Sequence, residues 1–172
     1  VISSFIFILF LTKFIQPKVY IDIDPTMGRK IPIAIPFAKI LQGCSDTYQF
    51  QELIPRVLSN DLDFSGYFKV LDPLGFLEDP RVVGITFDRI NFKNWATIGA
   101  EFLVTSGFTY DSTNLFLELR LFDVAQQKFL IGKRYKGEVG DIRKMLHRFA
   151  DEVINKITGK TGIFCCKIAY VG

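Results

Sequence analysis

Alternating hydrophobic and polar residues predict that much of this chain forms β-strands. The clearest block consists of three strand-length runs, residues 100–111, 115–124 and 128–137, which are separated by short polar links. Links of this length are typical of hairpins, so we expect an antiparallel sheet here. In the middle run the leucines at odd positions share one face, whereas Glu118 and Arg120 share the other.

Three further segments show the same period of two. Residues 18–24 alternate valine and isoleucine with tyrosine and aspartate, residues 31–37 alternate isoleucine with proline and alanine, and residues 67–72 form a shorter run. Proline lacks the backbone N–H that a strand donates. Pro32 and Pro36 therefore predict that the second segment lies at a sheet edge or pairs on one side only.

Two longer stretches have the spacing of amphipathic helices. In residues 46–65 the hydrophobic side chains form one broad stripe, but Pro55 lies inside it, so the helix either begins near this proline or kinks there. Residues 141–158 form the second stretch, with an aspartate at its start and a glycine directly after it. Residues 92–99 predict a short helix, and residues 74–91 show no clear pattern.

These elements predict an α/β fold: a mixed β-sheet with two main helices packed on one face. A length of 172 residues suits one ordinary domain. A hydrophobic content of 49% indicates a packed interior and argues against disorder.

The first residues are more uniformly hydrophobic than the rest of the chain. Residues 1–11 are apolar apart from two serines, and the run is shorter than the roughly 20 residues that a membrane-spanning helix needs. Its length fits the apolar core of a secretory signal peptide. We interpret residues 1–17 as the remnant of a signal peptide and residues 18–160 as the α/β domain. A short amphipathic or core helix is the alternative.

The charge balance argues against a nucleic-acid-binding protein. Lys and Arg number 21 and Asp and Glu number 18, which gives a formal net charge of +3. Nucleic-acid recognition needs a concentrated basic stripe, and the basic residues of this chain are scattered.

The sequence contains none of the common catalytic or metal-binding motifs. A single histidine, His147, excludes a three-histidine zinc site, and no glycine-rich phosphate loop or Gly-x-Ser-x-Gly motif is present. The three cysteines, Cys44, Cys165 and Cys166, cannot form a closed set of disulfides. We therefore expect no cofactor, no metal and no enzymatic activity.

Several charged residues allow a chemical role, but a surface role is favoured for each. Asp22 and Asp24 share one face of a strand, a spacing that also suits calcium binding or acid–base chemistry. Glu118 and Arg120 are expected to form a solvated pair. His147 falls off the hydrophobic stripe of its helix, which predicts an exposed side chain.

Three stretches of the chain carry a family resemblance: residues 18–24 (KVYIDID), 65–73 (SGYFKVLDP) and 148–171 (RFADEVINKITGKTGIF, then KIAYV). They resemble the TolB family, exported proteins of the bacterial Tol–Pal envelope system. This resemblance implies a small α/β amino-terminal domain followed by a six-bladed β-propeller. Residues 161–172 are accordingly expected to be the start of a propeller, truncated in its first strand.

The resemblance also implies a role in recognition. TolB-family proteins are non-enzymatic periplasmic adaptors that link the inner-membrane protein TolA to the outer-membrane lipoprotein Pal, for envelope integrity and for outer-membrane constriction in cell division. The propeller binds Pal, and the amino-terminal segment binds the carboxy-terminal domain of TolA. The full-length protein is expected to be a monomer without a stable membrane span. The matching TolA-binding residues in this chain are Lys18, Val19, Tyr20, Ile21, Asp22, Ile23 and Asp24.

The alternating pattern of this segment suits strand addition to a partner. Its backbone N–H and C=O groups would extend a partner's sheet, while Val19, Ile21 and Ile23 would fill pockets. Two alternatives remain open from the residues alone. One is a periplasmic small-molecule or nucleotide-binding α/β module, since such domains often bind ligands at strand ends. The other is a hydrolase whose active site lies in the propeller.

Overall fold

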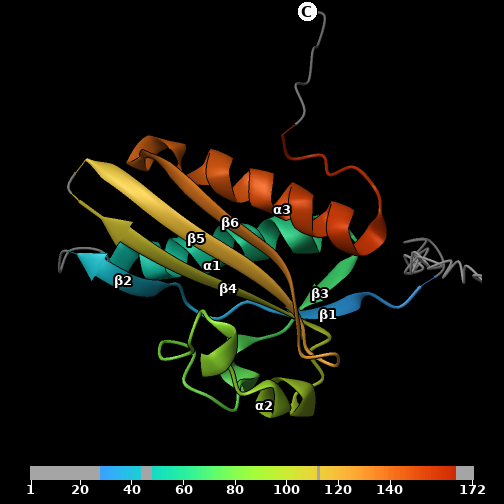
Figure 1. The fold of residues 1–172 in the computed structure, drawn as a ribbon. Helices are drawn as coiled ribbons and strands as arrows, with labels where there is room; N and C mark the ends of the chain where they lie inside the picture. The colour runs from blue at the N-terminus through green and yellow to red at the C-terminus, as the bar shows by residue number, and fades with distance from the viewer. Residues whose placement is uncertain (1–27, 44–47, 112, 166–172) are drawn as a thin grey trace, which may run out of the picture.

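The computed structural model describes residues 28–43, 48–111 and 113–165, which fold around one mixed β-sheet (Figure 1). Its six strands are β1 (Ile31–Ala34), β2 (Lys39–Gly43), β3 (Phe68–Val70), β4 (Phe102–Tyr110), β5 (Asn114–Asp123) and β6 (Lys128–Glu138). The α-helices are α1 (Tyr48–Phe64), α2 (Phe92–Thr97) and α3 (Ile142–Thr158). Short 3₁₀ turns occupy Pro73–Gly75, Phe87–Arg89 and Val139–Asp141. The predicted α/β class is confirmed.

The sheet combines parallel and antiparallel pairs in the order β3–β1–β4–β5–β6. β1 pairs in parallel with β3 and with the start of β4, and β2 pairs in parallel with the end of β4. Because β5 pairs along the whole of β4 on the other side, β1 and β2 follow one another along the same side of β4. The three strands β4, β5 and β6 form consecutive antiparallel pairs, as predicted.

The prolines do not place β1 at an edge, so that prediction is wrong. β1 pairs on both of its sides. The Ile31 N–H donates to the Tyr67 carbonyl toward β3 at 2.9 Å, whereas the Pro32 carbonyl faces the other way and accepts from the Glu101 N–H at 3.0 Å. Pro32 thus lies opposite Glu101, which precedes β4. The sheet therefore needs no hydrogen bond from the nitrogen of Pro32. Pro36 lies after the end of β1, in the link to β2.

A backbone contact from outside the helix compensates for the proline in α1. Pro55 has no N–H, so the carbonyl of Gln51 one turn earlier lacks its usual helical partner. The Ala38 N–H, in the link between β1 and β2, donates to this carbonyl at 3.1 Å. The helix runs from Tyr48 through Pro55, so the predicted start near Pro55 is wrong.

Both long helices pack on one face of the sheet, as predicted (Figure 1). The predicted leucine face of β5 points toward them, and α1 and α3 add side chains from their hydrophobic stripes. The residues that meet in this core and are completely buried include Leu115, Leu117, Leu119, Leu121, Ile54, Leu58, Leu62, Leu146, Phe149 and Val153. Their burial supplies the main hydrophobic stabilisation of the fold.

The stretch 74–91 consists of loops and short 3₁₀ turns, which explains its lack of a regular pattern. With α2 it lies at one end of the sheet (Figure 1) and contributes to a second, smaller core. The centre of this core is Trp95, which is 1% exposed and meets the Phe76 ring edge to face at 4.9 Å between centroids. The predicted short helix that carries Trp95 is confirmed as α2.

The described end of the chain differs from the predicted last strand. Helix α3 ends as predicted at Gly159, whose φ of 73° is in the left-handed region that suits glycine. Residues 163–165 then form a bend and a turn and not a strand. Asp151 of α3 causes this, because its carboxylate accepts the backbone N–H groups of Phe164 at 3.0 Å and Cys165 at 2.9 Å. The predicted signal peptide and the rest of the last strand lie outside the described residues.

We expect Leu119→Ala to lower the free energy of unfolding by about 2–5 kcal/mol, because it leaves a cavity between the sheet and the helices. Urea denaturation followed by circular dichroism measures the change. Leu74→Ala is the matched control, since Leu74 is 94% exposed, and it should shift the free energy by less than about 0.5 kcal/mol. Equal effects of the two substitutions would contradict the assignment of the core.

Candidate functional site

The predicted partner-binding residues, 18–24, lie outside the described residues, so the geometry of this site begins at the start of β1. Two cations there form ion pairs with different elements. Arg29 pairs with Glu101, which precedes β4, and the Lys30 Nζ lies 3.3 Å from Oδ1 of Asp63 in α1. These exposed pairs add little stability, but they join the start of the described chain to the rest of the domain.

Three strands of the described sheet have an unpaired side: β2, which pairs with β4 alone, and the two ends of the strand order, which differ in character. β3 is a short edge beside β1, and β6 is a long edge beside β5. Unpaired backbone groups on an edge can bind an added strand. β6 carries Lys133, Arg134 and Lys136, and cationic side chains on an edge oppose unspecific strand addition.

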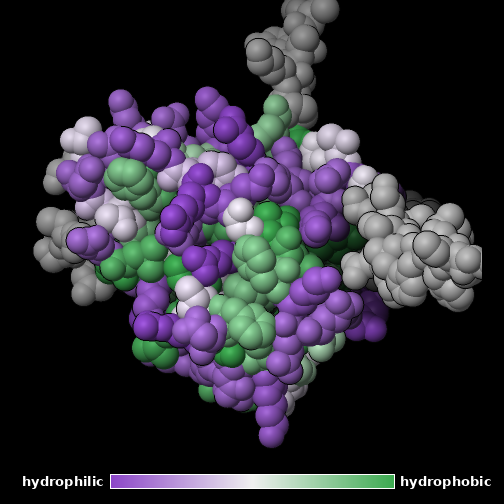
Figure 2. All heavy atoms as spheres, in the orientation of Figure 1, coloured by the Kyte–Doolittle hydropathy of each residue, from purple (hydrophilic) through white to green (hydrophobic). Residues whose placement is uncertain are grey.

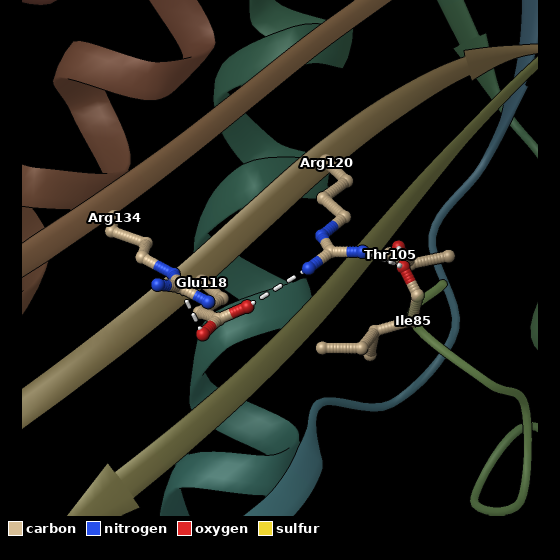
Figure 3. A network of polar contacts seen from close by, with 5 residues as sticks. All are labelled: Ile85, Thr105, Glu118, Arg120 and Arg134. Carbon is tan, nitrogen blue, oxygen red and sulfur yellow. Dashed lines mark hydrogen bonds and ion pairs between the residues drawn. The ribbon is translucent and has the colours of Figure 1, made fainter. Parts of the chain in front are cut away.

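The face of the sheet away from α1 and α3 is called the open face; it carries Thr105 of β4, Glu118 of β5 and Arg134 of β6. A charged network crosses it, formed by Glu118, Arg120 and Arg134 (Figure 3). Oε2 of Glu118 accepts from Nη2 of Arg120 at 3.1 Å, and Oε1 accepts from Nε of Arg134 at 2.9 Å. Both carboxylate oxygens are engaged, so the arrangement supports ion pairing and not proton abstraction.

The predicted pair of Glu118 and Arg120 is confirmed, but it is less solvated than expected. The side chains are only 19% and 25% exposed. Arg120 also donates through Nη1 to the Ile85 carbonyl at 3.4 Å, and the Thr105 hydroxyl donates to the same carbonyl at 3.2 Å (Figure 3). The segment before α2 is thereby held against the open face, where it helps to shield the pair.

His147 is not the isolated surface residue that the sequence predicts. Its Nδ1 lies 2.7 Å from Oδ2 of Asp61 in α1, a residue that is 7% exposed, and its ring stacks on Phe164. This contact joins α3 to α1. Burial raises the pKa of Asp61 above its usual value of 3.8, and the hydrogen bond from His147 acts in the opposite direction. The two residues are 86 positions apart, so no local pattern in the sequence indicates the contact.

Other candidate chemistry finds no support within the described part of the chain. Cys165 is exposed, while Cys44 and Cys166 lie outside the described ranges. Across residues 28–43, 48–111 and 113–165, no cluster of three His, Cys, Asp or Glu side chains is arranged to hold a metal ion. The helices found there lack the length and hydrophobicity that crossing a membrane requires.

Comparison with known proteins identifies relatives of the chain. A family model described as the TolB amino-terminal domain matches residues 19–130. The Tol-Pal system protein TolB of Desulfosudis oleivorans is 40% identical over 152 residues, which cover 88% of this chain and 35% of that protein. TolB of Syntrophotalea carbinolica is 43% identical over 115 residues, or 67% of this chain and 27% of the relative. The chain thus spans about a third or less of the length of these curated relatives.

A solved structure shares the fold. The crystal structure of TolB from Acinetobacter baumannii matches with a TM-score of 0.60 and 18% sequence identity, over 78% of this chain and 30% of that chain. At this identity the match concerns the arrangement of strands and helices alone.

We expect the stability of the protein to depend on pH through Asp61. Its folded-state pKa lies above the usual 3.8, so its stabilising contribution is complete below that value and is lost as the pH rises through the raised pKa. Asp61→Asn removes this titration. The unfolding free energy of the wild type should therefore fall relative to the variant between about pH 3 and 7, measured by urea denaturation. A constant difference over this range would contradict the raised pKa.

Proposed function

The chain belongs to the TolB family, and from this membership we propose that it is part of a non-enzymatic periplasmic adaptor of the Tol–Pal system. In this proposal residues 18–24 bind the carboxy-terminal domain of the inner-membrane protein TolA. The α/β domain at 18–160 precedes a β-propeller that begins within 161–172 and binds the outer-membrane lipoprotein Pal. The link between the two membranes serves envelope integrity and outer-membrane constriction in cell division.

The observation that carries the proposal is the family match, which begins at residue 19 and includes all but the first residue of the proposed TolA-binding segment. The curated relatives are named as Tol-Pal system proteins, and each of the two described above is at least 40% identical over its matched region. The matched regions cover only 35% and 27% of these relatives, so the roles of the propeller belong to the proposal for the whole protein.

Strand addition is the mechanism that the segment's pattern supports. With period two, Val19, Ile21 and Ile23 lie on one face of an extended strand and can fill pockets of a partner's sheet, while the backbone groups extend its hydrogen-bond ladder. The ion pairs of Arg29 and Lys30 join the chain to the domain just after this segment. A bound partner would therefore lie close to the start of β1.

The structural contacts of three acidic side chains support a role without catalysis. Asp61 joins α1 to α3, Asp151 holds the turn at 163–165, and Glu118 pairs with two arginines. Each of these carboxylates makes a contact that holds elements of the fold together, which fits a recognition domain.

Deletion of residues 18–24 should abolish measurable binding to the isolated TolA carboxy-terminal domain. The single substitution Ile21→Asp should weaken binding at least about tenfold, because it places a charge in a pocket that buries a hydrophobic side chain. Isothermal titration calorimetry with purified proteins measures both effects.

Asp22→Asn is the matched control, since its side chain lies on the opposite face of the same strand, and it should leave the affinity within about threefold of the wild type. Melting temperatures of all variants should stay equal, which separates a binding defect from unfolding. Unchanged affinity after the deletion would contradict the proposed site.

A further inference from the structure

The open face carries exposed hydrophobic side chains beside the charged network. Helices α1 and α3 cover the other face, whereas α2 covers only one end of the open face, where its Phe92 and Trp95 pack with Leu103 and Phe122 (Figure 1). Figure 2 shows hydrophobic and hydrophilic side chains next to one another over the middle of the open face. The partly exposed hydrophobic residues on it are Leu41, Phe87, Phe116 and Phe129. Hydrophobic groups gathered around polar ones are typical of protein interaction surfaces.

Two of these aromatic rings border an open cleft of about 430 Å³. Phe87, from the 3₁₀ turn before α2, and Phe129 of β6 line its hydrophobic part, and the charged network lines the rest. Phe129 lies over Gly132, where an added Cβ atom would approach the ring to 2.7 Å. A larger residue at position 132 would displace the ring, so the glycine helps to shape the cleft.

Arg134 has hydrogen-bond donors left for a ligand. Its side chain is 78% exposed, and among the described residues only its Nε meets an acceptor, Oε1 of Glu118. The two terminal nitrogens form a planar fork that matches a carboxylate through two parallel hydrogen bonds.

The charges around the cleft favour an anionic ligand. Of the charged residues that line the cleft, Lys133 is paired with Glu152 of α3. This leaves Arg120 and Arg134 with the carboxylate of Glu118. The Lys136 ammonium lies 5.4 Å from the centre of the Phe116 ring, so it stays on this face. A carboxylate next to hydrophobic side chains fits both halves of the cleft.

We propose that this cleft is a docking site for a peptide segment of a partner protein. An acidic side chain of the segment pairs with Arg134, and a neighbouring hydrophobic side chain packs between Phe87 and Phe129. This proposal does not rest on the function proposed above.

Selection of peptides from a random library displayed on phage, with the chain as target, tests this proposal. Enriched peptides should combine Asp or Glu with Phe, Leu or Ile. In titrations with synthetic copies of these peptides, Arg134→Gln should weaken binding about tenfold, because charge-assisted hydrogen bonds are lost. The matched control is Arg143→Gln on the exposed surface of α3, which removes the same charge from the helical side and should leave the affinity unchanged.

A second pair of variants tests the hydrophobic half of the cleft. Phe129→Ser should weaken binding by a similar factor, whereas Phe64→Ser at the end of α1, where the ring is 76% exposed, should not. Enriched peptides without acidic residues, or equal effects of Arg134→Gln and Arg143→Gln, would overturn the proposal. Self-association in sedimentation that Arg134→Gln abolishes would overturn it in favour of a second copy. Binding to phosphatidylglycerol vesicles that Arg134→Gln abolishes would overturn it in favour of a lipid surface.

Discussion

The strict alternation of side chains along β5 determines both faces of the sheet. Its odd-numbered leucines are completely buried beneath α1 and α3, and this burial directs Glu118 and Arg120 to the open face. A slip of one residue in register would expose the leucines to water and place both charges in the core. The register of β5 therefore determines both the hydrophobic core and the charged network. A shift of this register would disrupt both.

The elements that depend on local periodicity could be predicted from the sequence, and those that depend on context could not. The hairpins of β4, β5 and β6, the leucine face and helix α3 follow from patterns within each segment. The prolines show the limit of such rules. Pro32 and Pro55 each lack an N–H, as expected, but β1 needs none at that position and α1 receives a replacement donor from Ala38. Both compensations come from residues that a local pattern does not include.

The charged network shows the same limit in the functional surface. Glu118 and Arg120 are two positions apart in one strand, so their pairing could be predicted. Their partner Arg134 depends on the register between β5 and β6, which shifts by one residue next to Leu121. This shift is a β-bulge, and beyond it Asp123 pairs with Lys128. If the register continued from that pair without the bulge, Lys133 would lie opposite Glu118. The bulge instead brings Arg134 to that position. Glu118 therefore meets a planar guanidinium group and not the ammonium group of a lysine.

The first described strand, β1, and the proposed cleft lie on different parts of one sheet, and this separation bears on whether they are coupled. The cleft lies over β5 and β6, so β4 lies between it and β1. At about 4.8 Å per strand, β1 and β6 are roughly 14 Å apart across the sheet. Coupling would require an element with two arrangements that both partners favour differently. Strands β4, β5 and β6 are joined by backbone hydrogen bonds along their length and lie over a buried core. A closely packed core of this kind rearranges only at a high cost in free energy. The described part of the domain is therefore expected to transmit little coupling between β1 and the cleft.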